Sequence, residues 1–576
     1  MKEKESSQES LIMLKQLQNS YPEADYIEKS GTLILKEEEM FDALKKAYAS
    51  GGEMLLDITV IDYLDYPSPP PTRFALVYII RHKDFKERII LKTYLSEPRC
   101  LSITSIYKAA DWLERECYDQ YGIIFENHPN LKRILNHWQF EGHPLRRDYP
   151  TTKGQLCTQS EDLMPEMNQR LLQKGLVSKD KDGGYTECSK DLMFINIGPS
   201  HPATHGTIRN FSAMDGETIV SNISEIGYLH RGFEKSCENH TYNQIIPYTD
   251  RLDYCSATTN NIAFAKSVEE MLGLELPERA ITIRVLVMEL SRIINHLVAL
   301  AAQLVDMGAL TNYWYLYNPR ESAYTFFSKL TGARLTNSYM RIGGMSYDLY
   351  EGYEKDLRII MKEIKEGVGT ALSLIEHNRI FQDRTQNICT VNAKDAIDRG
   401  LSGPNLRASG VNYDMRVSNP YYFYDQLDFD VALGSVGDIY DRIMVRFEEI
   451  NQSLRIMEQL LGNIPDGEIC VNDASVVLPK KTDVYDSIEG VMNQFKLIYE
   501  GVKVPSQEYY SSIEATNGEL GFYIVSNGSG YPHKVKVRAP SFLAMSAYTS
   551  MVEGSMLADA ILNLGSINII AGEMDR

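Results

Sequence analysis

Hydrophobic and polar positions divide this chain into two parts that follow different periods. Near the N-terminal end, short runs of branched and aromatic residues alternate with polar turns, at 56–61, 74–80 and 88–94. Runs of this length between turn-forming segments predict strands, and we expect a small antiparallel sheet. Apolar side chains at helical spacing follow at 104–121, so the first part is expected to be α+β.

From residue 191 onward the pattern is mainly helical. Apolar positions recur every three to four residues over long stretches, which is the spacing of one helix face. The clearest stretches are 255–273, 279–306, 317–330, 351–376, 437–462 and 484–499. We expect a helical bundle with a β-rich entrance around 191–222 and a second β-rich segment near 520–538.

The stretch between the two parts follows neither period. It carries the polar, glycine-containing run 178–184 and one short helical pattern at 162–174, a composition typical of a linker. A chain of 576 residues also exceeds the size at which one hydrophobic core keeps growing. We therefore expect a first domain at 1–150, a linker at 151–190 and a second domain at 191–576.

Charge and composition narrow the possible partners. The net charge of −19 argues against binding nucleic acid, because that affinity depends on clustered lysine and arginine. We expect no membrane-spanning helix and, from the charged start Met1-Lys2-Glu3-Lys4-Glu5, no signal peptide. The eight cysteines form no CxxC pair, so we expect a reducing cytoplasm and no metal bound by this chain.

The segment GPSHPATHG at 198–206 sets two histidines four residues apart in a turn bounded by glycines. Proline fixes φ and glycine permits angles that other residues avoid, so the segment is predicted to be a shaped loop after the strand-like run 192–197. Turn chemistry alone explains these residues, so a purely structural turn is the alternative. The motifs around the loop favour a functional role.

Nine further segments are long, ordered and specific. They are IGYLHRGFEK at 226–235, DRLDY at 250–254, MELSR at 288–292, LVDMGAL at 304–310, RIGG at 341–344, LRASGVNYD at 406–414, GELG at 518–521, VRAPSF at 537–542 and MDR at 574–576. Together with the histidine loop, they resemble the quinone-site subunit of respiratory complex I, the proton-pumping NADH:quinone oxidoreductase. The resemblance implies a mainly helical domain like the large subunit of hydrogenases.

A second resemblance covers the end of the first part. The segments ERECYDQYG at 114–122, RIL at 133–135 and GHPLRRDYP at 142–150 are similar to the small scaffold subunit of complex I. Charged residues without a cofactor motif indicate docking more often than chemistry. The resemblance therefore implies a fused chain in which the first domain serves assembly.

The resemblance places His205 and Tyr254 at the headgroup of a quinone. Reducing a quinone needs two electrons and two protons, and aligned N–H and O–H donors stabilise the oxygens that become negative. Asp306 is implied as the carboxylate that pairs with the histidine, so that the pair can store and pass a proton. His201, the other loop histidine, is included among the quinone-binding residues. Alone, Asp306 would be interpreted as a solvated helix end, and Tyr254 is one of 36 tyrosines.

Arg231 and Arg251 are implied to lie beside the last [4Fe-4S] cluster, which a neighbouring iron–sulfur subunit binds. A nearby cation favours the reduced, more negative cluster, although ordinary salt bridges are the alternative for both residues.

Thr336 is a departure from the family pattern. Members often carry a histidine there, whose hydrogen bond makes the potential of the cluster depend on pH. A hydroxyl can donate a hydrogen bond but does not titrate near neutrality. We therefore predict a lower, nearly pH-independent potential, which suits a low-potential acceptor such as menaquinone.

Two alternatives compete with this interpretation. The large subunit of nickel–iron hydrogenases shares the Arg-Gly-x-Glu-Lys element but needs four thiolates in two CxxC pairs. Here Asp253 stands where the first thiolate would be, Cys255 is out of register, and 568–572 holds no cysteine. The other alternative is a non-catalytic scaffold subunit of a membrane-bound hydrogenase or ferredoxin-linked complex, against which the retained site residues argue.

The remaining expectations concern the setting of the chain. It has no glycine-rich phosphate loop, so NAD is expected to bind elsewhere, and the electron donor stays open. The resemblance implies an oxidoreductase that is catalytic within a larger complex and coupled to ion pumping. It also implies a peripheral position on the cytoplasmic side of the bacterial inner membrane. The partners would be other peripheral-arm subunits and a membrane-arm subunit at the quinone entry.

Overall fold

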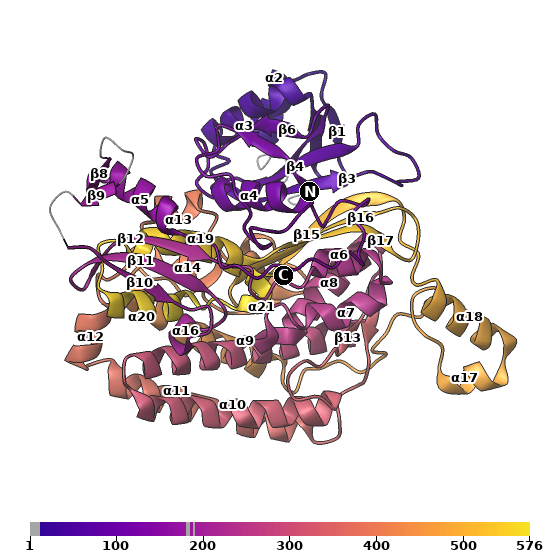
Figure 1. Ribbon diagram of the computed structural model, residues 1–576. Helices are drawn as coiled ribbons and strands as arrows, with labels where there is room; N and C mark the ends of the chain where they lie inside the picture. Colours follow the sequence, from indigo (N-terminus) through magenta and orange to yellow (C-terminus); the bar gives the residue numbers. More distant parts are fainter. Residues whose placement is uncertain (1–11, 180–184, 188–190) are drawn as a thin grey trace.

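The computed structural model describes residues 12–179, 185–187 and 191–576, which form two domains stacked on each other (Figure 1). The charged start of the chain and most of the polar run 178–184 lie outside these residues. Helix and strand are mixed in both domains.

A five-stranded sheet in the order β1-β2-β5-β4-β3 forms the first domain. Its strands are β1 (Asp25–Ile27), β2 (Thr32–Leu35), β3 (Met54–Asp62), β4 (Phe74–Arg81) and β5 (Arg88–Leu95). The three predicted strands are confirmed and pair antiparallel, but β2 pairs parallel with β5. The predicted antiparallel pairing of these three strands is confirmed. Strands β1 and β2 were not predicted, and the alternation of side chains could not reveal that β2 pairs parallel with β5.

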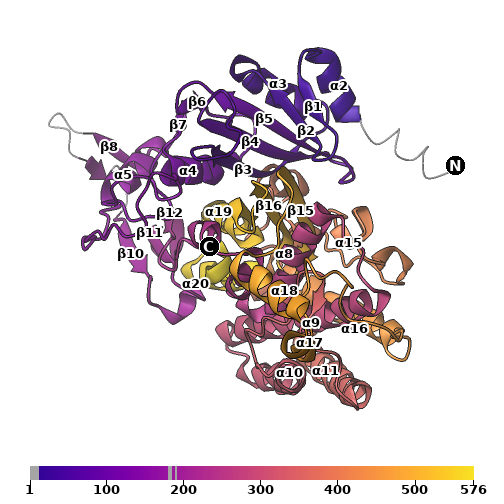
Figure 2. The same ribbon diagram turned by 90° about the vertical axis from the view of Figure 1, so that its right-hand side faces the viewer.

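Both faces of this sheet are covered. Every residue of β3 and β4 is buried. The helices α2 (Ile12–Ser20) and α3 (Met40–Ala49) lie on the side away from the second domain, which closes the opposite side (Figure 2). The continuous burial explains why these strands are apolar along their whole length.

The predicted helix 104–121 begins later than expected, as α4 (Ala110–Tyr121). The residues before it form turns, because the buried carboxylate of Glu114 accepts a hydrogen bond from Ile103 N at 2.7 Å and holds that segment outside the helix. Gly122 ends the helix with φ +73°, a left-handed conformation that suits glycine. The short strands β6 (Arg99–Leu101) and β7 (Ile124–Glu126) flank it.

The connecting segment is anchored to the second domain. It contains α5 (Met164–Gln173), β8 (Val177–Lys179) and β9 (Tyr185–Glu187). Arg170 of α5 donates a hydrogen bond to Asn222 O at 2.8 Å, and Met167 and Leu171 are buried in a small apolar cluster with Ala213 and Ile223. The short helix predicted at 162–174 is therefore confirmed, and it packs on the entrance sheet.

The second domain combines long helices with two small sheets, and both sheets lie on the side of the first domain (Figure 1). The entrance sheet consists of β10 (Met193–Ile197), β11 (Arg209–Asp215) and β12 (Thr218–Glu225), and the other sheet of β15 (Gln507–Ala515), β16 (Gly518–Ser526) and β17 (Pro532–Arg538). The helices used below are α8 (Ala257–Leu272), α9 (Glu278–Asp306), α10 (Leu310–Thr331), α11 (Tyr353–Ile375), α16 (Ile439–Leu460), α17 (Lys481–Asp486), α18 (Ile488–Tyr499), α19 (Pro540–Val552), α20 (Leu557–Ile567) and α21 (Ala571–Met574).

These elements confirm the helical pattern with three differences. The helix α10 begins seven residues earlier than predicted, and the stretch 484–499 is split into α17 and α18 at Ser487, whose hydroxyl caps α18. Strand β15 was not predicted. It pairs with β16 and is buried over most of its length. The alternation of buried and exposed side chains that would predict a strand is therefore absent.

Helix α9 is the centre of the second domain. Its length and composition would suit a membrane span, contrary to our expectation that no such stretch exists. However, 89% of its most apolar 18-residue stretch is buried inside the protein. It is the one such helix among the described residues. Helices α8, α10, α16 and α20 pack around it, which accounts for its apolar character on all sides.

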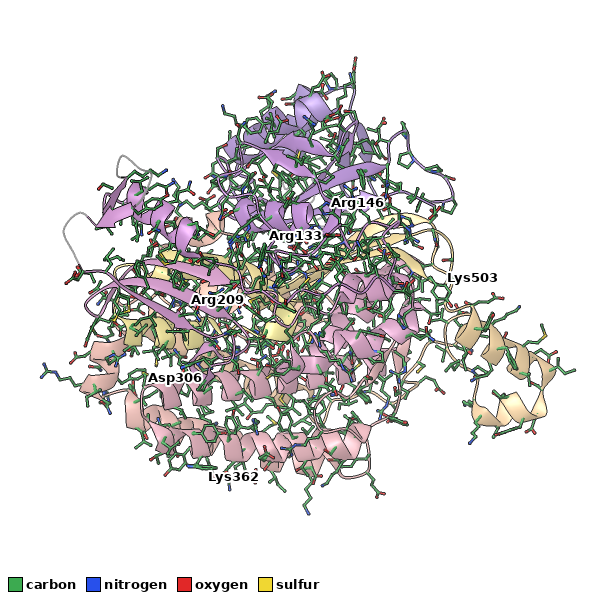
Figure 3. The ribbon with its side chains drawn as sticks, viewed as in Figure 1. Arg133, Arg146, Arg209, Asp306, Lys362 and Lys503 are labelled. Atoms are coloured by element: carbon green, nitrogen blue, oxygen red, sulfur yellow. The ribbon has the colours of Figure 1, made fainter. Side chains whose placement is uncertain are left out.

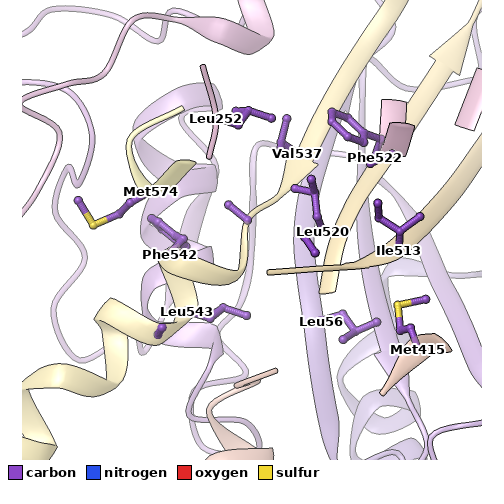
Figure 4. Close-up of a cluster of buried hydrophobic side chains, with 14 of the residues drawn as sticks. Leu56, Leu252, Met415, Ile513, Leu520, Phe522, Val537, Phe542, Leu543 and Met574 are labelled. Atoms are coloured by element: carbon purple, nitrogen blue, oxygen red, sulfur yellow. The ribbon is translucent and has the colours of Figure 1, made fainter. Parts of the chain in front are cut away.

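The two domains meet across a buried seam of apolar and charged groups. Figure 4 shows Leu56 of β3 among apolar side chains of the second domain, including Leu520 and Leu543. Ion pairs cross the same boundary: Arg81 lies 3.1 Å from Glu519, and Lys92 lies 2.6 Å from Glu508. In Figure 3 the labelled Arg133 and Arg146 lie where the two domains adjoin.

Candidate functional site

The histidine loop joins β10 to β11 and has the rigid shape that its sequence predicts. Gly198 has φ +93°, and a Cβ there would overlap the carbonyl oxygen of Ile208. Within the loop, the Thr204 hydroxyl lies 2.7 Å from both His201 O and Gly206 O. These local constraints fix the direction in which the loop presents His205.

His205 contacts Asp306 directly. Its Nε2 lies 2.6 Å from Asp306 Oδ2, and the side chains are 21% and 18% exposed. His205 has φ +50° at the end of the short 3-10 turn Pro202–Thr204, while Asp306 is the last residue of α9. Asp306 is labelled at that end of the helix in Figure 3. Two residues 101 positions apart thus form one partly exposed pair.

A glycine of α20 makes room for this pair. A Cβ at Gly565 would lie 3.2 Å from Asp306 Oδ2 and 3.4 Å from His205 Nε2. The first distance is tighter than almost all real Cβ contacts, so a side chain at this position would push against the pair. The absence of a side chain at Gly565 is therefore part of the geometry of the site.

Tyr254 begins the 3-10 turn Tyr254–Ser256, in which the side chain of Asp253 accepts a hydrogen bond from Cys255 N at 3.1 Å. Burial raises the pKa of Tyr254 to about 12, so the phenol is protonated at neutral pH. Among the described residues its hydroxyl has no hydrogen-bond partner. A protonated hydroxyl without a partner is free to donate to a ligand.

The C-terminal segment brings Tyr254 and the histidine loop together. A Cβ at Gly206 would lie 3.1 Å from Ala571 Cβ, and a Cβ at Gly572 would lie 3.4 Å from Tyr254 Cδ1. The loop and the tyrosine therefore adjoin consecutive residues of α21. No hydrogen bond joins Tyr254 to His205 within the described part of the chain.

The two arginines lie side by side next to Tyr254. Arg231 Nη2 donates to Arg251 O at 3.1 Å and to Gly572 O at 3.4 Å, and Gly572 is the residue beneath the Tyr254 ring. Burial, followed by the charge of Arg251, lowers the pKa of Arg231. Arg251 donates to Pro247 O and lies 3.9 Å from Asp250. Among the described residues no carboxylate lies within ion-pair distance of Arg231, so the ordinary salt bridge does not account for it.

Among the described residues, neither Thr336 nor His201 forms a side-chain hydrogen bond to this group. The segment after Thr336 is connected to the residue before Arg251, because Ser338 N donates a hydrogen bond to Asp250 Oδ2 at 3.0 Å. His201 is exposed, and its Nδ1 accepts a hydrogen bond from Ala203 N at 3.1 Å. The described structure brings His205 and Asp306 into contact and places Tyr254 and Arg231 around Gly572, but it does not join His201 to them.

Two buried acids behind Tyr254 were not among the predicted site residues. Asp253 accepts hydrogen bonds from Ser256 Oγ at 2.9 Å and from Asn295 Nδ2 at 2.6 Å, and burial raises its pKa to about 6. Burial and the charge of Asp253 raise the pKa of Glu573 to about 8. In the sequence, Asp253 stands within the DRLDY motif, whereas no pattern pointed to Glu573.

Two further kinds of site could coincide with the position of His205, Tyr254 and Arg231: metal-ligand clusters and cavities. Among the described residues no cluster of three or more histidine, cysteine, aspartate or glutamate side chains is placed to hold a metal ion. A cavity of about 810 Å³ lies elsewhere, at the domain boundary, with Arg88, Lys266 and Tyr510 among its walls.

Comparison with known families matches both domains. Residues 306–576 match the family described as "Respiratory-chain NADH dehydrogenase, 49 Kd subunit", and residues 33–155 match "Respiratory-chain NADH dehydrogenase, 30 Kd subunit".

Individual relatives cover most of the chain. A protein of Bdellovibrio bacteriovorus, named as the C/D subunit of NADH-quinone oxidoreductase, is 50% identical over 514 residues, which is 89% of each chain. An Aquifex aeolicus protein, named as a second C/D subunit of the same enzyme, is 37% identical over 537 residues, 90% of this chain and 91% of its own. A Myxococcus xanthus protein, named as the D subunit of NADH-quinone oxidoreductase, is 49% identical over 387 residues, 67% of this chain and 92% of its own.

Proposed function

Because this chain belongs to the family of fused C/D subunits of NADH-quinone oxidoreductase, we propose that it forms the quinone-reduction site of a respiratory complex I. The observation that carries the proposal is the contact of 2.6 Å between His205 and Asp306 beside the protonated phenol of Tyr254. The chain is then an oxidoreductase only as part of the complex. A pure scaffold role is not favoured, since it would need none of these groups.

His205 and Tyr254 act as the two proton donors in this proposal. The quinone gains two electrons, supplied by an iron–sulfur cluster of a partner subunit, and one proton at each carbonyl oxygen. The Tyr254 hydroxyl has no competing partner among the described residues, and it can donate to one oxygen as negative charge develops there. The imidazolium of His205 donates to the other oxygen from Nδ1, because Nε2 faces Asp306.

Asp306 links this chemistry to ion pumping. While His205 is protonated, its charge is balanced by the carboxylate 2.6 Å away. Once His205 has given up its proton, the negative charge of Asp306 is no longer balanced. We propose that this change in charge starts the rearrangement that drives the pumping subunits.

In this proposal Arg231 and Arg251 lie beside the iron–sulfur cluster that supplies the electrons. They lie next to each other at the surface, and Arg231 has no carboxylate partner among the described residues. Two adjacent cations favour the reduced form of a cluster bound by a neighbouring subunit. Thr336 is proposed to face the same cluster, and His201 is proposed as a further contact of the quinone.

The proposal also places the chain in the cell. As a complex I subunit it is associated with the membrane as a peripheral component and has other complex I subunits as partners. We propose that it lies on the cytoplasmic side, against an iron–sulfur subunit and a membrane-arm subunit. NAD is bound by another subunit, and menaquinone is the proposed acceptor.

Replacing Asp306 by Asn in the assembled complex tests the function. The amide keeps the size of the side chain but cannot balance an imidazolium, so coupled turnover should fall by about 100-fold while assembly persists. Quinone reduction and proton pumping would be measured in purified, reconstituted complex, together with labelling by a photoreactive quinone analogue. Wild-type turnover and pumping, or labelling confined to other subunits, would refute the proposed role.

A further inference from the structure

A helical arm projects from the second domain, away from the histidine loop (Figure 1, right). It consists of α17 and α18 and lies between α16 and β15 in the chain. One face of α18 carries large apolar side chains that are 38% to 80% exposed. They are Ile488, Val491, Met492, Phe495, Ile498 and Tyr499. Tyr485 of α17, 77% exposed, lies nearby in the sequence.

The spacing of these residues follows one face of a helix. They occur at i, i+3, i+4, i+7, i+10 and i+11, which is the pattern of anchors with which a helix fills an apolar groove. The opposite face packs inward, because Gly490 and Leu497 are buried. The exposed stripe is therefore a second apolar face on a helix whose first apolar face is already used.

The arm does not need this stripe in order to fold. The Ser487 hydroxyl accepts a hydrogen bond from Gly490 N at 3.0 Å and caps α18. A Cβ at Gly490 would overlap Asp483 O, so the two helices pack backbone to backbone at this point. Local caps and close packing hold the arm, and its outer apolar face is left uncovered by the described part of this chain.

The exposed area matches one side of a stable protein interface. Six large side chains at these exposures present on the order of 800 Å² of mostly apolar surface, and a standard interface buries about 800 Å² on each partner. Contiguous apolar patches above about 300–600 Å² are rare on soluble monomers unless they bind something.

The charges around the stripe favour a protein over a lipid surface. Residues 480–503, which are the arm and its flanks, contain four lysines (480, 481, 496 and 503) and four acids (483, 486, 489 and 500), so this region carries no excess of positive charge. Helices that lie on bilayers carry lysine or arginine on the polar face, because anionic lipids attract them. The whole chain, at −19, would be repelled by such lipids.

We propose that the outer face of α18 docks into an apolar groove on another protein subunit of the same complex, with Phe495 as the central anchor. The proposal rests on membership of a multi-subunit family but is independent of the roles given to His205, Tyr254 and Asp306. A buried aromatic side chain at the centre of an interface carries a large share of its binding energy.

Site-specific photo-crosslinking in the intact complex tests the proposal. Benzoylphenylalanine replaces Phe495 in one variant and Glu489 in a control, which lies about 120° around the same helix at 100° per residue. Both complexes are purified, irradiated and analysed by mass spectrometry. We expect a crosslink from position 495 to one defined protein subunit, and none to that subunit from position 489. Crosslinks only to lipid, or none from position 495, would overturn the proposal.

A pair of charge variants gives a second, independent measurement. Phe495→Glu should reduce the yield of assembled complex by more than about tenfold, whereas Glu489→Lys should leave it unchanged. The thermal unfolding of the isolated chain should be the same for both variants, since both side chains are exposed. Normal assembly of the Phe495→Glu complex would refute the docking role. A loss of turnover in Asp306→Asn with normal assembly would leave it standing.

Discussion

The seam between the domains and the histidine loop both set a carboxylate against a basic side chain, but they differ in the type of base, in burial and in the number of partners. At the seam, Glu116 is 4% exposed and lies between Lys536 at 2.5 Å and Arg576 at 2.8 Å. In the loop, His205 has Asp306 as its ion-pair partner, and both side chains are about one-fifth exposed.

This difference separates a structural role from a chemical one. A buried carboxylate held by two cations stays ionised, and the pKa of Glu116 is lowered chiefly by Arg576 and Lys536, against the effect of burial. Any change of its charge would leave cations stranded in the interior. A partly exposed pair can exchange its proton with a ligand or with water. The seam thus fixes how the domains sit, whereas the loop pair is open to the proton exchange that we propose for it.

Removing the carboxylate of Glu116 should give the largest effect. Glu116→Gln leaves Lys536 and Arg576 buried without their closest acid, and breaking such a group costs about 3–5 kcal/mol of unfolding free energy. Denaturant unfolding of the isolated chain would measure it. The matched control is Glu23→Gln, which breaks the exposed pair with Lys36 and should cost much less, because solvent screens that pair. Equal losses of unfolding free energy in the two variants would contradict the distinction between buried and exposed pairs.

Tyr254→Phe should affect activity and leave stability nearly unchanged. The ring still packs on Gly572, but one proton donor is lost, so turnover of the assembled complex should fall by about 100-fold. Tyr347→Phe is the control, because Tyr347 is 61% exposed and lies outside the site. If Tyr254→Phe destabilised the chain as much as Glu116→Gln, the tyrosine would belong with the structural group.

Thr336→His tests whether the residue at position 336 decides the pH dependence of the potential of the adjoining cluster. A histidine can titrate where threonine cannot, so the adjoining cluster should acquire a potential that falls by up to about 59 mV per pH unit. EPR redox titration of the assembled complex at two pH values would compare this variant with the wild type. A clear slope in the wild-type complex would contradict the predicted role of Thr336.

Cutting the connection between the domains should have the smallest effect. A protease site placed at 153–156, where Leu156 is 89% exposed, would be cleaved after assembly. Turnover should change by less than about twofold, because a tether mainly raises effective concentration before assembly. A complete loss would show that the seam alone cannot hold the domains together.

Local patterns predict much of this fold. Five of the six long helices predicted from apolar spacing are present as single helices, because such spacing records which side of a helix meets the core. The sixth, 484–499, is divided into α17 and α18, and its apolar side is exposed. The start of α4 could not be predicted, since it depends on Glu114 reaching Ile103 N. The parallel pairing of β2 with β5 and the buried strand β15 also escaped, because pairing partners come from distant parts of the chain.

For the candidate site, the sequence supplied the residue types and the structure supplied their neighbours. GPSHPATHG predicts a shaped loop from the torsional limits of proline and glycine alone, and the family motifs identify His205, Tyr254 and Asp306. The contact across 101 residues and the backing by Gly565 and Gly572 depend on how α9, α20 and α21 pack. Burial by that packing also decides which carboxylates and phenols hold their protons, because desolvation depends on every element around a group.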